Sequence, residues 1–325
     1  MICYVTVDTE YDFGFTRSNG HASRQANFSR SIAGRTPSGE FGVRYQMAAL
    51  DRYGLKAVFF VDPMPALVWG TAAIEDIVGP IVAGGHDVQL HMHTEWLELA
   101  GSRNPLGRSM GTNIKDFEYE QQCVLLDFAK GVLVAAGARE PAAFRAGNYG
   151  ASDDTLRALA VVGLRYDTSH CPGIANSACD IRLTSADQDP VDHCGVVEVP
   201  IGCMGGWRGG LRHAQITAVS AAEMHAALQY GHAQGRRSFT IVTHSFELLS
   251  RDRSRVNRLV RHRFDSLCRT LAALDGISTG TYRDSPPEAF VGSRHRAAGP
   301  LPFNMLRTGA RMSEQILGNA LYGRR

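Results

Sequence analysis

The chain lacks the features that mark a membrane-spanning, nucleic-acid-binding or disulfide-stabilised protein. No stretch of its 325 residues approaches the ~20 consecutive apolar residues needed to cross a bilayer. The formal net charge is only +2, so the charge balance implies neither nucleic acid nor membrane as a partner. The seven cysteines are scattered, odd in number and without a CxxC pair, which excludes the usual zinc-knuckle signature and favours a reducing compartment.

The beginning of the sequence also lacks the basic region, long apolar core and cleavage site of a signal peptide. Together with the missing apolar spans, this predicts a cytoplasmic protein. What is present is an ordinary globular composition, with 44% hydrophobic and 20% charged residues. A barrel-type domain occupies roughly 200 to 250 residues, so the length fits one large domain with extensions better than two unrelated domains.

Short apolar, β-branched runs alternate with longer segments of helical periodicity, which predicts βα units around a parallel sheet. The expected strands lie at residues 3–7, 57–61, 87–90, 142–144, 164–166, 196–200, 239–242 and 276–278. The expected helices lie at residues 42–53, 118–136, 153–162, 221–233 and 255–273. Segments 14–40 and 180–194 are rich in small and polar residues, and we interpret them as loop excursions used for binding or as lids.

Ionisable residues follow several of these expected strands directly, namely Asp8, His91, Arg145, Asp167 and His244. The carboxyl ends of strands in a covered parallel sheet open onto the loops that form the active site. Independent strands are therefore expected to deliver these side chains to one mouth of a barrel.

Two of the segments indicate a metal site. Asp8 and Glu10 project to the same side in extended geometry, so that one carboxylate can bind a cation while the other stays free as a base. His91 and His93 share a face if their strand continues, and Glu95 follows them. Neutral imidazoles with a carboxylate are the ligands favoured by zinc and similar divalent ions, whereas a single histidine here would more often be structural.

His244 ends an apolar strand and has an ordinary pKa of about 6.5, which suits proton donation near neutrality. The alternative is a histidine at the edge of the core that bonds a backbone carbonyl.

In this order, the segments resemble the motifs of the polysaccharide deacetylase family (carbohydrate esterase family 4, the chitooligosaccharide deacetylase homology domain). Residues 144–150, Phe-Arg-Ala-Gly-Asn-Tyr-Gly, resemble the third motif of the family, and Asp8-Thr9-Glu10 resembles a variant of the first. Residues 90–93 resemble the second motif and residues 242–245 the last. The resemblance covers about residues 1–283.

This resemblance implies an irregular (β/α)7 TIM-like barrel as a single catalytic domain over residues 1–285, with residues 286–325 as a basic C-terminal extension. It implies that Asp8 is the general base, that Arg145 positions Asp8, and that His244 is the general acid. Glu10 and His91 would be metal ligands. The third ligand is His93 or Glu95, and we favour His93 because neutral nitrogen ligands leave the metal more electrophilic. Zn²⁺ is the expected ion, with Co²⁺, Ni²⁺ and Mn²⁺ as alternatives.

The expected function is therefore metal-dependent removal of N-acetyl groups from an amino-sugar saccharide or polysaccharide precursor. Two alternatives stay open. One is hydrolysis of another C–N amide bond, in a cyclic imide or a peptide amide. The other is a catalytically silent barrel that binds saccharides, which the irregular first and second motifs suggest.

The candidate substrate-binding residues are Tyr149, Asp167, Trp96, Trp207 and Glu95. Trp207 lies in a Gly-rich segment where it could stack on a sugar ring, or where it could belong to an ordinary loop. Trp96 follows the proposed ligands and would either form a wall of the site or pack in the barrel.

The C-terminal part is rich in arginine. Arginines at 251, 253, 255, 258, 261 and 263, with those of the tail at 294, 296, 307, 311, 324 and 325, form either a solvated surface or one that attracts anionic lipid or a diphosphate-linked saccharide. In the tail, Met312, Ile316, Leu317, Ala320 and Leu321 share an apolar face. We expect this face to dock on the barrel or on a second subunit rather than on a membrane.

Overall fold

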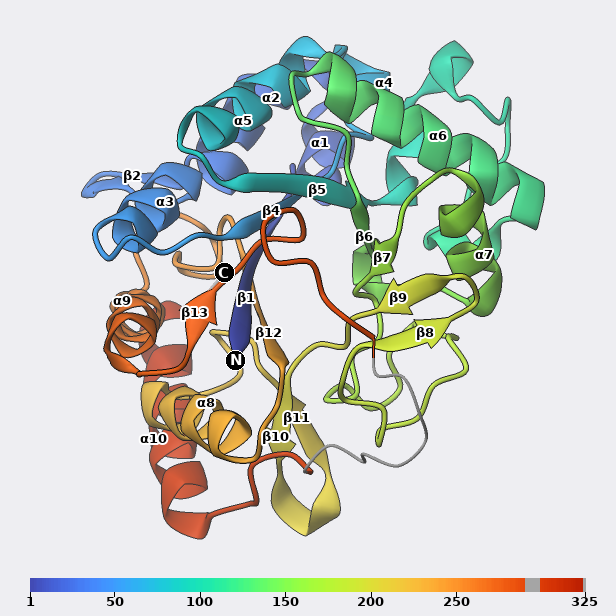
Figure 1. Cartoon of the computed structure of the whole chain (residues 1–325). Coiled ribbons are helices and arrows are strands. Elements are labelled where there is room, and N and C mark those ends of the chain that lie inside the picture. The colour runs from blue at the N-terminus through green and yellow to red at the C-terminus, as the bar shows by residue number, and fades with distance from the viewer. Residues whose placement is uncertain (290–298, 324–325) are drawn as a thin grey trace.

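A curled sheet forms the centre of the molecule in the computed structural model, which describes residues 1–289 and 299–323 (Figure 1). Its strands are β1 (Ile2–Thr9), β4 (Val58–Val61), β5 (Asp87–Met92), β6 (Ala143–Ala146), β7 (Tyr166–Asp167), β8 (Val191–His193), β9 (Val196–Glu198), β12 (Ser238–His244) and β13 (Ser278–Thr279). Eight of these strands of the described chain are mutually parallel: seven follow one another in the order β12-β1-β4-β5-β6-β7-β9, and β13 pairs with β1. β8 adds an antiparallel edge, and β13 lies beside the start of β1.

Helices cover the outside of this sheet (Figure 1). The longer ones are α3 (Val43–Asp51), α5 (Ala72–Ala83), α6 (Tyr119–Ala135), α7 (Asp153–Val161), α8 (Ala221–Ala233), α9 (Arg258–Ala273) and α10 (Met305–Tyr322). The eight predicted strands and five predicted helices are all present, which confirms the predicted βα alternation. The curled parallel sheet with helices outside it also agrees with the predicted irregular (β/α)7 barrel.

Segment 14–40 differs from its prediction as a loop, because it is mostly helical. It contains α1 (Phe13–Asn19), the short helices η1 (His21–Ser23), α2 (Arg24–Asn27) and η2 (Phe28–Ile32), and the small hairpin of β2 (Arg35–Thr36) and β3 (Gly39–Glu40). The polar residues that suggested a loop bond one another inside it. The fully buried Asn27 accepts a hydrogen bond from the backbone N–H of Asp12 at 2.9 Å and donates one to the hydroxyl of Thr16 at 2.8 Å.

The gap between β9 and β12 is filled by the segment that contains the hairpin β10 (Cys203–Gly205) and β11 (Leu211–His213). The backbone N–H of Gly202 donates to the carbonyl of Thr240, and that of Val242 donates to the carbonyl of Ala214, both at 2.9 Å. A side chain at position 202 would come within 2.8 Å of the Phe239 ring and of the Thr240 carbonyl. Only glycine therefore lets this segment reach β12 and complete the wall.

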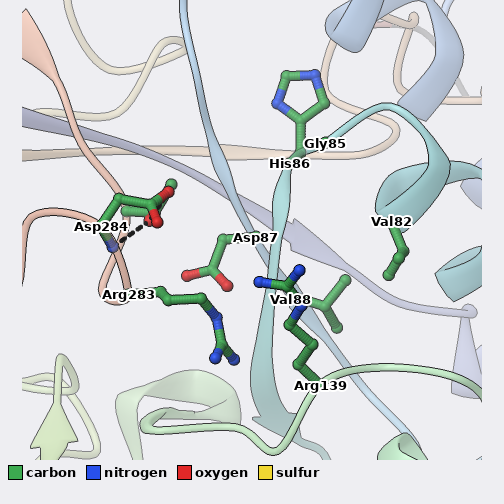
Figure 2. Close-up of a pocket in the computed structure, with 9 residues that line it drawn as sticks. Val82, Gly85, His86, Asp87, Val88, Arg139, Arg283 and Asp284 are labelled. Carbon is green, nitrogen blue, oxygen red and sulfur yellow. Dashed lines mark hydrogen bonds between the residues drawn. The ribbon is translucent and has the colours of Figure 1, made fainter.

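At the end where β5 begins, charged side chains surround a cavity of about 180 Å³ (Figure 2). Asp87, Arg139, Arg283 and Asp284 contribute charges of both signs, and His86 lies beside them. This cavity is at the amino ends of the strands, where residues of such barrels usually serve stability rather than catalysis.

The apolar face of the C-terminal helix α10 does not pack on the barrel as predicted. Its polar face contacts α8 and α9, while Met312, Ile316 and Leu317 are more than half exposed. Of the two predicted partners of this apolar face, the barrel is therefore wrong, and a second subunit stays a prediction. No helix of the described residues has the length and apolarity to span a membrane. The tail arginines at 294, 296, 324 and 325 lie outside the described residues.

Candidate active site

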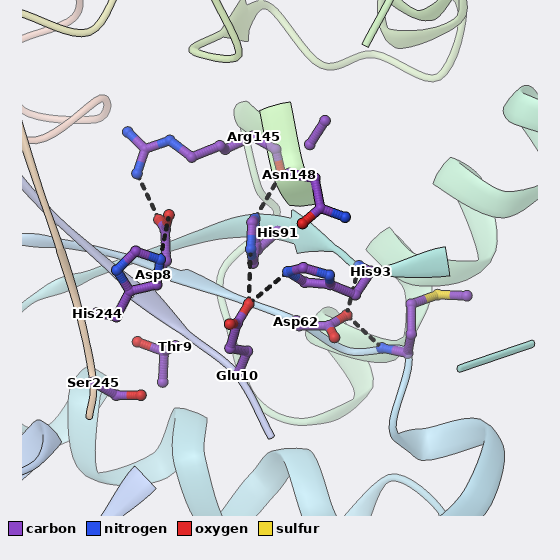
Figure 3. A network of polar contacts seen from close by, with 12 residues as sticks. Asp8, Thr9, Glu10, Asp62, His91, His93, Arg145, Asn148, His244 and Ser245 are labelled. Atoms are coloured by element: carbon purple, nitrogen blue, oxygen red, sulfur yellow. Dashed lines mark hydrogen bonds and ion pairs between the residues drawn. The ribbon is translucent and has the colours of Figure 1, made fainter. Parts of the chain in front are cut away.

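The register of the sheet brings the predicted residues together in pairs. Asp8 at the end of β1 lies opposite His244 at the end of β12, and His91 in β5 lies opposite Arg145 in β6. Because these strands are parallel, all four side chains reach the same mouth, together with Glu10 just beyond β1 (Figure 3).

Asp8 forms a buried ion pair with Arg145. The Nη1 atom of Arg145 donates to Oδ1 of Asp8 at 2.5 Å, and their side chains are 0% and 5% exposed. The guanidinium also lies over the Phe60 ring, 4.4 Å from its centroid. Oδ2 of Asp8 is left facing Nε2 of His244 at 3.9 Å. One oxygen of the carboxylate is thus fixed by the arginine, and the other faces the histidine.

Glu10, His91 and His93 form a compact cluster (Figure 3). Oε2 of Glu10 lies 3.1 Å from Nε2 of His91 and 2.6 Å from Nε2 of His93. The other ring nitrogens have partners of their own, because Nδ1–H of His91 donates to the backbone carbonyl of Arg145 at 2.8 Å and Nδ1–H of His93 donates to Glu95 at 2.9 Å. When a cation is bound, such bonds would fix the tautomer in which Nε2 carries the lone pair, as in metal-ligating histidines.

The pKa values of Glu10 and His93 are shifted because their side chains lie so close together. Burial by itself raises the pKa of Glu10, but the charges and hydrogen bonds of the two histidines outweigh burial and hold that pKa well below its usual range. Burial lowers the pKa of His93, whereas Glu10 and Glu95 together raise it well above 6.5. A divalent cation bound between the carboxylate and the two imidazoles would balance the buried negative charge of Glu10. The donor set therefore fits such an ion.

Asp62 belongs to this network and was missed in the sequence. It follows β4 directly and is fully buried, and its Oδ1 accepts hydrogen bonds from the backbone of Met64 at 3.0 Å and of His93 at 3.4 Å. Its Oδ2 has no hydrogen-bond partner among the described residues. Burial raises the pKa of Asp62 to about 6, against the opposing effect of His93 and His91. An orphaned carboxylate oxygen beside the cluster also fits a cation at this place.

His244 has a carboxylate partner that was also missed. Nδ1 of His244 lies 3.5 Å from Oε1 of Glu247, whose side chain is 7% exposed. Glu247 is fixed in turn by Gln215 and by the Thr217 hydroxyl, which donates to it at 2.8 Å. Burial lowers the pKa of His244, but Glu247 and then Asp8 raise it to about 9. His244 is therefore held in its protonated form at neutral pH.

A strained turn after β6 packs against the cluster. Asn148 and Tyr149 both have left-handed backbones, with φ of 55° and 57°, which is costly for residues other than glycine. At Gly147 a side chain would come within 2.7 Å of Nδ1 of His93. The glycine therefore lets the turn approach the histidine closely. Tyr149 contacts the small apolar cluster of Cys171, Ile201 and Val242.

Two of the predicted substrate-binding residues are not placed to contact a substrate. Asp167 is fully buried and accepts hydrogen bonds from the backbone N–H and the hydroxyl of Ser169, both at 2.9 Å. Burial and the adjacent Asp167 raise the pKa of Glu198, its neighbour on β9, well above its usual range. Trp96 is also fully buried, with its ring 5.4 Å from that of Trp69, and serves packing.

Two other candidate substrate-binding residues, Glu95 and Trp207, are at least partly exposed. Glu95 holds His93, as described above, and is partly exposed. Trp207 is 59% exposed in the turn between β10 and β11, and its ring lies 5.5 Å from that of Phe303. The same turn lines a cavity of about 440 Å³ through Gly209, Gly210 and Leu211, and Cys171 lines it from the opposite side.

A second group of metal-ligand types, Asp153, His193 and Cys194, lies at the start of α7. Here Asp153 already pairs with His193 at 2.9 Å and accepts the backbone N–H of Arg182 at 2.9 Å. The carboxylate thus ties the β8–β9 hairpin and a loop to the helix, which is a structural role.

The fold belongs to the class of incomplete (β/α)7 barrels. It is similar to that of a candidate polysaccharide deacetylase from Mycobacterium smegmatis, with 16% identity, coverage of 85% of this chain and 86% of that one, and a TM-score of 0.52. Lower TM-scores of 0.42 and 0.47 relate it to a family 4 carbohydrate esterase from Streptomyces lividans (14% identity, 89% and 97% covered) and a 4-α-glucanotransferase from Thermococcus litoralis (12% identity, 89% and 39% covered). Neither a protein-family model nor a curated protein sequence matches the chain.

At 16% identity, the likeness to the Mycobacterium smegmatis protein concerns the fold alone. It confirms the fold that the sequence motifs implied. The roles of the residues at the mouth rest on their geometry.

Proposed function

We propose that this protein is a hydrolase that uses a divalent cation to remove N-acetyl groups from an amino-sugar saccharide. The observation that carries the proposal is the position of Asp8, fixed by Arg145 on one side, facing His244 on the other, and adjacent to the Glu10, His91 and His93 cluster. This arrangement supplies a proton acceptor, a proton donor and a cation site at one mouth.

Asp8 acts as the general base. The ion pair with Arg145 fixes one oxygen of its carboxylate and leaves Oδ2 to take a proton from the attacking water. His244 acts as the general acid, because Glu247 keeps it protonated and Nε2 can then give its proton to the departing amine. Each such group typically contributes about 10²- to 10⁴-fold to the rate.

Glu10, His91 and His93 would hold the cation, and Glu95 would orient His93 from behind rather than serve as the third ligand. A bound divalent cation supplies Lewis acidity and lowers the pKa of a coordinated water toward ~7. Zn²⁺ is the proposed ion because two of the three ligands are imidazoles.

A saccharide amide is the proposed substrate for two reasons. The fold is that of a candidate polysaccharide deacetylase. A cavity of about 440 Å³ also lies close to the mouth, because its lining residue Cys171 belongs to the small apolar cluster against which Tyr149 packs. A reducing, cytoplasmic setting is part of the proposal and is supported by seven cysteines that form no disulfide.

The test is release of acetate from N-acetylglucosamine oligomers by purified protein, before chelation, after chelation and after Zn²⁺ is restored. We expect release that stops on chelation and returns with the ion. Hydrolysis of cyclic imides or peptide amides without acetate release would replace the proposed substrate class. Binding of the oligomers without any turnover in the presence of Zn²⁺ would show a silent saccharide-binding barrel instead.

A further inference from the structure

Helix α10 presents its apolar face to solvent. Leu306 is 83% exposed, Ile316 70% and Met305 69%. The exposed residues of the helix are Met305, Leu306, Gly309, Ala310, Met312, Ser313, Ile316, Leu317, Asn319, Ala320 and Leu321. None of them carries a charge. An uncharged, largely apolar face of this length on a protein surface is characteristic of an interaction site.

The opposite face of α10 fixes this orientation through polar contacts with the barrel. Arg311, which is 4% exposed, lies 3.4 Å from Glu223 of α8, and Glu314 pairs with Arg263 of α9 at 2.8 Å. At the end of the helix, Arg255 donates to the carbonyl of Leu321 at 2.8 Å. Turning the apolar face inward would break these contacts and would leave Arg263 buried without its partner.

The surroundings of this face are basic and aromatic. At the start of the helix, the exposed Trp207 packs on Phe303 and is followed by the exposed Arg208. At its end the exposed Arg251 and Arg255 lie beside the last turn, with Asp252 as the acidic residue between them in sequence. Apolar residues on a helix face, with arginines and a tryptophan around them, match a helix that lies in the surface of an anionic bilayer.

We propose that α10 docks the protein on a lipid bilayer that carries anionic headgroups, with the helix lying in the plane of the surface. A second copy of the chain is the less suitable occupant. The face offers eleven exposed residues, whereas a stable interface uses about 20 to 30 residues on each side.

One end of the docking helix lies near the candidate active site. The last turn of α10 is bonded to the loop that follows His244 and Glu247, because the backbone N–H of Arg251 donates to the carbonyl of Tyr322 at 3.0 Å. The end of the docking helix, α10 in Figure 1, is therefore bonded to the loop that carries Glu247, the carboxylate partner of His244.

The experiment is flotation of the full-length protein with vesicles of phosphatidylcholine alone or mixed with phosphatidylglycerol. The variant Ile316→Gln/Leu317→Gln removes apolar side chains that are 70% and 57% exposed. The matched control Val134→Gln/Val161→Gln removes apolar side chains that are 45% and 69% exposed on α6 and α7. Unchanged melting temperatures establish that both variants fold.

We expect the wild type and the control to float with the phosphatidylglycerol vesicles and to bind them less at high salt. The Ile316→Gln/Leu317→Gln variant should partition at least about tenfold more weakly. Absence of wild-type flotation, or equal flotation of all three proteins, would overturn the proposal. So would a lipid-free dimer in light scattering that the Ile316→Gln/Leu317→Gln variant converts to a monomer, since the face would then bind a second copy.

Discussion

Replacing Glu247 with glutamine should move the alkaline limit of activity toward neutral pH. Glu247 is the first cause of the raised pKa of His244, through its hydrogen bond and its charge. Glutamine has nearly the same shape and can still accept hydrogen bonds from Gln215 and Thr217, but it carries no charge. Burial, which lowers the pKa of His244, would then be opposed only by the more distant carboxylates of Asp8 and Glu10.

The size of the effect follows from the protonated fraction of His244. A general acid works only while protonated, so activity is present below the pKa and is lost as pH rises through it. With a pKa of about 9, roughly 0.9 of His244 is protonated at pH 8. If the pKa returns to 6.5, roughly 0.03 stays protonated. The variant should therefore be about 30-fold slower at pH 8 and nearly unchanged near pH 5.5.

The assay is kcat/KM for acetate release from pH 5 to pH 10, with cation content measured in both proteins. A cation beside Asp8 would lower the pKa of His244 in both, so the difference between the two profiles is the quantity to compare. Profiles with the same alkaline limb, or a loss of equal size at every pH, would refute the role of Glu247 in keeping His244 protonated.

Four further results are expected. Asp8→Asn should lower kcat at least about 100-fold with the cation retained, and near-normal turnover would exclude Asp8 as the base. His91→Ala should lose the cation in elemental analysis, whereas His193→Ala, in the structural group at α7, should keep it. Glu95→Ala should weaken cation affinity about 10- to 100-fold in chelator competition, because it removes the hydrogen-bond partner of His93. Arg145→Met should lower the free energy of unfolding in urea by about 3–5 kcal/mol, because the buried Asp8 loses its ion-pair partner, while the exposed Arg139→Met should change it by less than about 0.5 kcal/mol.

Much of the fold could be predicted because the strands are short apolar runs between longer helical segments. The same pattern placed Asp8, His91, Arg145 and His244 at one mouth, since parallel strands end together. The rule that finds polar residues after strands applies equally to Asp62, which follows the apolar run 57–61 and could have been found.

Other features depend on contacts that periodicity does not report. Asp167 satisfies the same strand-end rule, but its carboxylate is buried within the fold and accepts a hydrogen bond from the backbone N–H of Ser169. Glu247 lies in a turn three residues after His244, where no motif or spacing marks it. For α10 the sequence showed which residues share a face, yet the ion pairs of Arg311 and Glu314 with distant helices decide which face meets the barrel.

The pairing of β1 with β12 also has a consequence for how the chain folds during synthesis. β1 is made first, but β12, the strand that pairs with it, lies more than 200 residues later in the chain. At about 5–20 residues per second, the ribosome needs roughly 10 to 45 seconds to deliver it. During that time one edge of an apolar strand has no hydrogen-bonding neighbour, which is the condition under which nascent chains aggregate. Chains that stop before β12 should therefore require chaperones to stay in solution, and they would lack His244, the proposed general acid.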